Sequence, residues 1–481
     1  MKKYKFLSLS VLVAFGTFVS SCDRVDYGDL NSQQIQTEKG DPEALLRGAM
    51  ARYFTLGGRD YLANATNYAQ YQTQLVYTSE SRYADTEGFW DQYYAVILPG
   101  LKLAAEVTYS PKGNTANLNA TADLFSLLVW QRVTDTFGDI PYTQALQGVG
   151  NLTPGYSKQE DIYKDIILRA KSDRDRFDTS AFLLSGSADI VFQGSISKWK
   201  KFANSFIMSV AVKLSKKYPA AGGYAATEFN AALTNAAGVM TTNADNMVFT
   251  YDVANAVSNP FSGLRGADYS ASRQFTDALK GTVSSFNPTS NHTADGRRVK
   301  YLTSSTTNGI PYGYATTSGS GNRLNSTNVR AAAAPRYEFT AAYTYLNRAE
   351  AATLGWTSES ATAMLDMGIN TSFTQWAAIG GPAYSTARLT DASTPALLKQ
   401  VIGEEKWVAL FPNGYAAWTE WRRTGYPNLL PAPDYLNSGV IPGRVRYPAT
   451  ELTLNNVSYN GGVSTLLPAV DKNSSKLWWA Q

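Results

Sequence analysis

The chain has 481 residues, of which 44% are hydrophobic and 17% charged, so it is long enough to bury a substantial core. It contains a single cysteine, Cys22, and a single histidine, His292. Cysteine–histidine catalysis, histidine-based triads and cysteine/histidine zinc sites are therefore excluded, and an intrachain disulfide cannot form. We expect no metal and no cofactor, because nucleotide-binding glycine motifs are also missing.

The formal net charge is +4, and most of it comes from the first 21 residues, which hold three lysines and no acid. Without them the chain carries 40 basic against 39 acidic residues. No run of lysine and arginine suggests a phosphate-binding stripe. We therefore expect no nucleic-acid partner.

Residues 1–21 have the layout of an export signal. Lysines at 2, 3 and 5 precede the apolar run 6–19, and Ser20 and Ser21 lead to Cys22. The apolar run is shorter than the roughly 20 residues that a membrane-spanning helix needs. The segment resembles a bacterial lipoprotein signal, which implies that Cys22 is acylated and begins the mature protein. The alternative is an ordinary secretory signal that happens to end near a cysteine.

Amphipathic helices dominate the rest of the chain. Asp41 and Pro42 predict a helix start, and Ser157 with Glu160 predicts a capping box before another helix. Helical spacing of apolar residues also predicts helices in three further segments, 196–214, 361–376 and 395–402. We expect Pro219 to end the helix that begins at Ile196.

Alternating strand patterns are few, so the fold class is predicted to be mainly α. Paired helices over this length suggest either a large bundle or a solenoid of helical hairpins, although no strict 34-residue period is visible. Between 241 and 335 the helical pattern gives way to glycine, serine, threonine and asparagine with scattered tyrosines. This stretch is predicted to be a loop-rich insertion.

The sequence does not exclude a glycosidase, because such an enzyme needs only two suitably placed carboxylates. Asp135 and Asp139 flank a short turn and could be taken for such a pair. We expect them instead to cap and tighten a loop between helices. No catalytic residue is predicted.

Several sequence blocks resemble the SusD/RagB family of outer-membrane nutrient-binding lipoproteins, in its second SusD-like branch. The blocks, which lie in family order, are DTFGDIPYTQAL at 135–146, YSKQEDIYKDI at 156–166, the WKKFANS core within 194–214, the helix end within 336–352, EEKWVALFPNGYAAWTEWRRTGYP at 404–427, IPGRVRYP at 441–448 and DKNSSKLWW at 471–479. The match extends from Cys22 to the carboxyl terminus.

The resemblance implies a single SusD-like domain over 22–481, with tetratricopeptide-like helical hairpins as a scaffold for the 241–335 insertion. It implies a protein that is not an enzyme, is lipid-anchored to the outer membrane and faces the cell exterior. Such a protein binds an oligosaccharide or a peptide and delivers it to a SusC-type TonB-dependent transporter. The shared blocks are expected to serve as core and interface, including Trp407, Trp418, Arg422 and Arg423.

Ligand-binding residues do not follow from the resemblance, so we sought stretches where exposed rings accompany hydrogen-bonding groups, because sugars bind such surfaces. Two stretches fit, 77–90 and the insertion. The candidate ligand-binding residues are Arg82, Tyr83, Trp90, Tyr301, Tyr312, Tyr314 and Arg323. The alternative is that both stretches are solvated loops.

Two other functions remain open from the sequence, a surface glycosidase and a structural or adhesive surface lipoprotein. The acids after Cys22, at 23, 26 and 29, are spread out and do not form a compact acidic export tag. Attachment to the outer membrane is therefore better supported than exposure at the cell surface. The sequence does not identify the ligand.

Overall fold

The structure is a computed structural model that describes residues 41–59, 64–86, 88–437 and 439–481. The described residues from Pro42 onward belong to one unit, Pro42–Gln481. The predicted signal peptide, 1–21, and the predicted lipidation site, Cys22, lie outside the described residues. No helix in the described ranges has the length and apolar character needed to cross a membrane.

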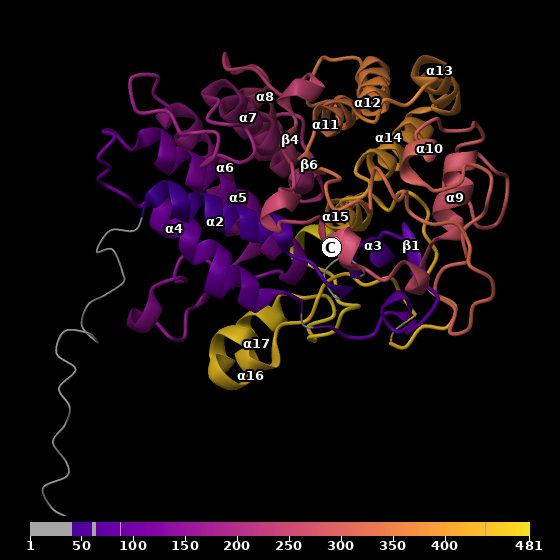
Figure 1. Ribbon diagram of the computed structural model, residues 1–481, viewed down its shortest axis with the longest axis horizontal. Helices are drawn as coiled ribbons and strands as arrows, with labels where there is room; N and C mark the ends of the chain where they lie inside the picture. Colours follow the sequence, from indigo (N-terminus) through magenta and orange to yellow (C-terminus); the bar gives the residue numbers. More distant parts are fainter. Residues whose placement is uncertain (1–40, 60–63, 87, 438) are drawn as a thin grey trace, which may run out of the picture. The chain divides into compact units, whose positions relative to one another are not determined.

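The fold is mainly helical, as predicted (Figure 1). The longer helices are α2 (Pro42–Thr55), α4 (Leu98–Ala105), α5 (Ala116–Phe137), α6 (Gln159–Arg176), α7 (Ile196–Lys213), α8 (Tyr224–Leu233), α9 (Arg273–Lys280), α11 (Ala341–Thr353), α12 (Ala361–Gln375), α13 (Gly381–Asp391), α14 (Pro395–Ala409), α15 (Gly414–Thr424) and α17 (Asn456–Ser464). The short helices are α3 (Asn64–Tyr68), α10 (Arg298–Tyr301) and α16 (Ala449–Leu454). The short strands are β1 (Gln72–Gln74), β2 (Ile140–Pro141), β3 (Tyr156–Ser157), β4 (Met247–Phe249), β5 (Tyr269–Ala271) and β6 (Arg336–Phe339).

Helices that follow one another in the chain pack against one another. The packed pairs run α2 with α4, α4 with α5, α5 with α6, α6 with α7 and α7 with α8. The series continues through α7 with α11, α11 with α12, α12 with α13, and α14 with α11 and α15. This order of neighbours is the expected stack of helical hairpins, and Figure 1 shows it running from α4 and α2 through α7 to α12 and α14.

Most of the predicted helix starts are confirmed. Capping residues mark these starts because their side chains accept hydrogen bonds from the free N–H groups of the first turn. The Ser195 side chain accepts a hydrogen bond from the Lys198 N–H at the start of α7. The predicted capping box at Ser157 is wrong. Helix α6 begins two residues later, at Gln159, and the Asp139 carboxylate accepts that residue's N–H at 2.8 Å. Helix α7 ends at Lys213 and is followed directly by a 3₁₀ turn, Leu214–Lys216, so the helical segment ends shortly before Pro219.

Antiparallel strand pairs join the region 241–335 to the rest of the chain. β1 pairs with β5, so Thr73 lies opposite Ser270, and β4 pairs with β6. Between 303 and 328 no helix or strand is present in the structure apart from isolated bridges. This long segment is therefore shaped by hydrogen bonds to neighbouring segments and not by an element of its own.

Candidate functional site

Tyr77 is the most exposed ring of the first predicted stretch, with 65% of its surface accessible. The Arg59 guanidinium lies 5.0 Å from the ring centroid and also donates a hydrogen bond to the Tyr77 carbonyl. Arg59 is itself held by Glu80 at 2.6 Å. Burial by itself would raise the pKa of Glu80, but hydrogen bonds from Arg59 and Gln74 lower it below its usual value. Glu80 is therefore ionised at neutral pH and fixes the cation beneath Tyr77.

Tyr314 is the second exposed ring, with 38% of its surface accessible. The chain beside it is fixed by backbone contacts, because the Ala315 N–H donates to the Asp434 carboxylate at 2.8 Å and the Ala315 carbonyl accepts from Thr78 Oγ1 at 3.3 Å. Gly313 has a φ of +80°, and a Cβ there would lie 2.4 Å from the Ala432 Cβ. Glycine is therefore required for this segment to lie against the 432–437 segment.

Tyr435 is the third exposed ring, with 51% of its surface accessible. Its segment is hydrogen-bonded to the first stretch at two points. Arg82 Nε donates to the Asp434 carbonyl at 2.6 Å, and the Leu436 N–H donates to the Arg82 carbonyl at 2.8 Å. The segments that carry Tyr77, Tyr314 and Tyr435 are far apart in sequence but are thus joined to one another by hydrogen bonds.

We call the surface made by Tyr77, Tyr314, Tyr435, Arg82 and Asp434 the three-tyrosine surface. None of the described residues forms a hydrogen bond to any of the three tyrosine hydroxyl groups. The surface therefore combines apolar ring faces with free hydroxyls, a guanidinium and a carboxylate. Such a combination suits a ligand that has both C–H faces and hydroxyl groups.

Four of the predicted binding rings are not exposed, which corrects the expectation from the sequence. Tyr83, Trp90, Tyr301 and Tyr312 are each at most 6% accessible. They pack on other rings: Trp90 is 5.0 Å from Phe137 between centroids.

Two of these buried rings support the three-tyrosine surface from beneath. The Tyr83 hydroxyl accepts a hydrogen bond from the Ala432 N–H at 2.9 Å, and its ring lies 6.2 Å from Tyr312. Arg323 donates to the Gly266 carbonyl at 2.6 Å and also to that of Tyr269, so it fixes the turn that leads into β5. Of the seven predicted residues, only Arg82 and Tyr314 belong to the surface itself. Ligand binding by any of the seven stays a prediction.

Sequence reasoning missed Tyr435 altogether and did not name Tyr77, although Tyr77 begins the first predicted stretch. A signal for Tyr435 was present, because it follows the turn-forming sequence PAPD at 431–434 and belongs to no helix or strand. A ring in such a turn has no helical or strand face to bury it. Its spatial neighbours could not be read from the chain.

The two acids considered for a glycosidase are occupied by structural contacts. Asp135 is 5% accessible and its carboxylate is engaged by Lys213 Nζ at 3.1 Å and by Gln131 Nε2 at 2.9 Å. Asp139 accepts the first N–H of α6, so its predicted role in tightening the loop between helices is confirmed. Asp135 lies inside α5 and does not cap the loop, which corrects the expectation for that residue; its carboxylate instead joins α5 to Lys213 of α7.

The strongest resemblance block, 404–427, lies in the core, as expected. Trp407 and Trp418 are at most 1% accessible, and the Arg422 guanidinium lies 3.6 Å from the Trp418 ring centroid. Arg423 is 3% accessible and pairs with Glu420 at 2.6 Å. These residues hold helices together and do not form a ligand pocket.

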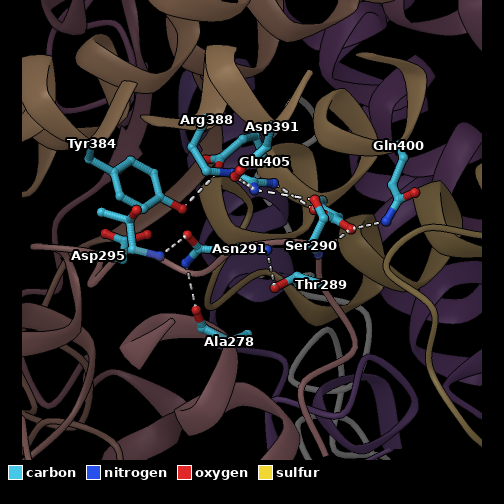
Figure 2. Close-up of polar contacts among 12 residues, drawn as sticks. Ala278, Thr289, Ser290, Asn291, Asp295, Tyr384, Arg388, Asp391, Gln400 and Glu405 are labelled. Carbon is cyan, nitrogen blue, oxygen red and sulfur yellow. Dashed lines mark hydrogen bonds and ion pairs between the residues drawn. The ribbon is translucent and has the colours of Figure 1, made fainter. Parts of the chain in front are cut away.

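A second set of buried charges joins the loop 289–297 to α13 and α14 (Figure 2). Arg388 contacts both Glu404, at 2.5 Å, and Glu405, at 3.0 Å. The loop contributes Ser290, whose N–H and hydroxyl both donate to Glu404, and Arg297, which pairs with Glu405 at 2.8 Å. No group of three or more metal-ligating side chains is present within the residues that the structure describes.

The order of the packed helices makes this chain a helical-repeat protein that displays loop segments with exposed rings. It belongs to the SusD-like family described as starch-binding and associating with the outer membrane, whose model matches residues 33–448. This membership supports a carbohydrate-binding role in association with the outer membrane.

Solved structures with a similar fold include SusD homologues. The chain is similar to a chitin-binding protein, with 24% identity, a TM-score of 0.78 and coverage of 92% of this chain and 100% of the other. It is similar to a chitin-binding SusD homologue from Flavobacterium johnsoniae, with 23% identity, a TM-score of 0.76 and coverage of 91% and 98%. A SusD homologue from Bacteroides uniformis gives 23% identity, a TM-score of 0.74 and coverage of 91% and 99%. A comparison with curated proteins gives no match.

Proposed function

We propose that this protein is a lipid-anchored outer-membrane binding protein that captures oligosaccharides on the three-tyrosine surface and delivers them to a SusC-type TonB-dependent transporter. One observation carries the proposal: three distant segments, each of which carries one exposed tyrosine, are joined to one another by hydrogen bonds. Because these hydrogen bonds already hold the backbone in place, ligand binding should cost little entropy for ordering the loops.

The chemistry of the surface favours a neutral sugar chain over a purely apolar ligand. Sugar C–H faces pack on aromatic rings, and sugar hydroxyls need donors and acceptors in fixed positions. Arg82 supplies donors and Asp434 supplies acceptors beside the rings. A peptide remains the alternative ligand, because tyrosine-rich surfaces also bind peptides.

The sequence at the amino terminus supports attachment to the membrane. We propose that residues 1–21 are removed and that Cys22 carries acyl chains, so that the mature protein is the single domain 22–481. Two or three acyl chains anchor a protein durably, whereas a single acyl chain binds a bilayer only marginally, at about 0.8 kcal/mol per buried methylene. The domain is proposed to face the cell exterior, with the 241–335 insertion supplying Tyr314 to the binding surface.

The proposed binding surface is tested by replacing Tyr77, Tyr314 and Tyr435 with Ala, singly and together, and by measuring oligosaccharide binding by calorimetry. Oligomers of N-acetylglucosamine are the first probe, because two of the similar structures are described as chitin-binding; starch oligomers and peptides complete the panel. Binding in the millimolar to micromolar range corresponds to about −4 to −8 kcal/mol. Losing one ring that contacts the ligand should therefore remove most detectable binding.

Tyr109→Ala is the matched control, because Tyr109 is 62% accessible and lies outside the three-tyrosine surface. Circular dichroism should show unchanged helix content in all the variants. If the triple variant binds the cognate ligand as tightly as the unmodified protein, the binding site lies elsewhere. Release of reducing sugar from any glycan of the panel would favour the glycosidase alternative, which the engaged carboxylates of Asp135 and Asp139 argue against.

The proposed partner is tested by affinity purification from the outer membrane. A protein of this size that covers a barrel should bury more than the roughly 1,600 Å² of a standard interface, so the complex should survive detergent. We expect a TonB-dependent barrel in near-equal amount. Recovery of the lipoprotein alone, in detergents that preserve other barrel complexes, would favour an adhesive role.

A further inference from the structure

The backbone at Tyr77 has a conformation that is unfavourable for a residue with a side chain. Its φ is +55°, in the left-handed region that residues other than glycine seldom adopt. Gln70 and Tyr83, in the same part of the chain, also have positive φ values, of +55° and +68°. Such conformations persist where neighbouring contacts hold them, and they are concentrated at functional sites. The contacts that hold Tyr77 therefore indicate how its ring is positioned.

Arg59 contacts Tyr77 at two points. Its guanidinium donates a hydrogen bond to the Tyr77 carbonyl and lies over the ring, 5.0 Å from the centroid. The cation is attracted by the quadrupole of the ring, so this contact favours one orientation of the side chain. Because Arg59 lies over one face of a ring that is still 65% accessible, the opposite face is the one left for a ligand.

The position of Arg59 is fixed in turn by the buried Glu80 carboxylate. The two side chains form a bidentate pair, with Arg59 Nε 2.6 Å from Glu80 Oε1 and Nη2 2.8 Å from Oε2. Gln74 at the end of β1 donates to the same carboxylate, and its own Oε1 accepts the Ser81 N–H at 2.9 Å. Glu80 is 8% accessible and Gln74 is fully buried. A continuous set of contacts thus joins a buried strand to an exposed ring.

We propose that Arg59 is a positioning residue for ligand binding, which holds Tyr77 in its positive-φ conformation and directs a sugar to the opposite face of the ring. Arg59 acts through Tyr77 and does not contact the ligand itself. This inference rests on the proposed function, because it assigns Arg59 a role in oligosaccharide binding by the three-tyrosine surface. Lysine replaces Arg59 only in part, because its ammonium group lacks the planar fork that pairs with Glu80.

A double-mutant cycle in the full chain tests whether Arg59 acts through Tyr77. The probe in calorimetry is the hexamer of N-acetylglucosamine, or maltohexaose if that hexamer does not bind. Arg59→Gln should weaken binding by at least about fivefold, and Arg59→Lys should recover part of this loss because it keeps a charge beside the ring. Tyr77→Leu keeps an apolar side chain, so that residual binding can be measured. In that background Arg59→Gln should change the affinity by less than about twofold, because the ring through which it acts is absent.

Arg348 offers a matched control, because it makes the same kinds of side-chain contact elsewhere. Its Nε lies 3.1 Å from Glu359 Oε1, and its guanidinium is 5.0 Å from the centroid of the Tyr345 ring. Tyr345 belongs to α11 and is not part of the three-tyrosine surface. Arg348→Gln should therefore leave the affinity for the hexamer unchanged. An equal loss of affinity in Arg348→Gln and Arg59→Gln would show a general loss of stability and would overturn the proposal.

Two further results would also overturn the role of Arg59. One is unchanged affinity in Arg59→Gln, and the other is an equal loss with and without Tyr77, which would make Arg59 a direct ligand contact. Both leave the proposed function standing as long as the tyrosine variants weaken binding. If neither hexamer binds the unmodified protein, or if the triple tyrosine variant binds as tightly, the binding surface itself is wrong and the role of Arg59 with it.

Discussion

Arg388 is the residue whose replacement tests the physical account of this fold most directly. It is 1% accessible and its guanidinium contacts three carboxylates, at 2.5 Å to Glu404, 3.0 Å to Glu405 and 2.6 Å to Asp391 (Figure 2). Methionine has a similar length but no charge and no donors. Arg388→Met therefore removes three ionic contacts while keeping most of the buried volume.

The expected cost follows from what remains around the two buried glutamates. Glu404 keeps its hydrogen bonds from Ser290 and Gln400, and Glu405 keeps those from Arg297 and Tyr384. Glu404 loses the only cation that pairs with it within the described residues, and Glu405 keeps only Arg297. Breaking a buried ion pair from one side costs about 3–5 kcal/mol, so we expect a loss of that size in the free energy of unfolding.

The pH dependence of this loss has a definite sign. Burial alone would raise the pKa of Glu405, but the charges of Arg297 and Arg388 lower it below its usual value of 4.5. A lowered folded-state pKa contributes stability above pH 4.5 that is lost as the pH falls through the folded value. The difference between unmodified protein and Arg388→Met should therefore be large near pH 7 and should shrink as the pH falls below 4.5.

The assay is urea unfolding followed by circular dichroism and tryptophan fluorescence, with urea chosen because it does not screen charges. Arg265→Met is the matched control, since the Arg265 side chain is 74% exposed and its contact with Asp268 is 3.7 Å long. An exposed pair of this kind contributes about 0–1 kcal/mol. A loss below about 1 kcal/mol for Arg388→Met, or one that does not change with pH, would refute the reasoning.

Three further predictions concern other parts of the chain. Burial and the neighbouring Asp123 carboxylate raise the pKa of Asp173 to about 9, so the folded state loses stability as the pH rises from 3.8 towards 9. Asp173→Asn should therefore stabilise the protein by more than about 1 kcal/mol at pH 7 and little at pH 4. An equal effect at both pH values in urea unfolding would contradict this. Gly313→Ala should cost at least about 1–2 kcal/mol through its positive φ, and the 2.4 Å approach of its Cβ to the Ala432 Cβ adds to that cost. The variant should also weaken oligosaccharide binding by displacing Tyr314, and unchanged affinity in calorimetry would be the opposing result. Cys22→Ala should block lipid attachment, and equal membrane fractionation of variant and unmodified protein would disprove acylation at this residue.

The sequence predicted the helical class and several helix boundaries because their causes are local. Pro395 follows a capping threonine, and α14 begins where that pair predicts. The same local reasoning failed at Ser157, because a carboxylate from another loop, Asp139, caps α6 in its place. A cap from a distant residue leaves no mark at the helix start itself.

The amino-acid sequence by itself determined the fold class, the family and the absence of histidine- and cysteine-based chemistry, since these depend on residue types and on spacing along the chain. Only the tertiary structure decided which tyrosines are exposed. Tyr312 and Tyr314 are two residues apart, yet one supports the surface from beneath and the other lies on it. Exposure depends on which distant segments pack against a residue, and contacts such as that of Gly313 with Ala432 are not encoded in local pattern.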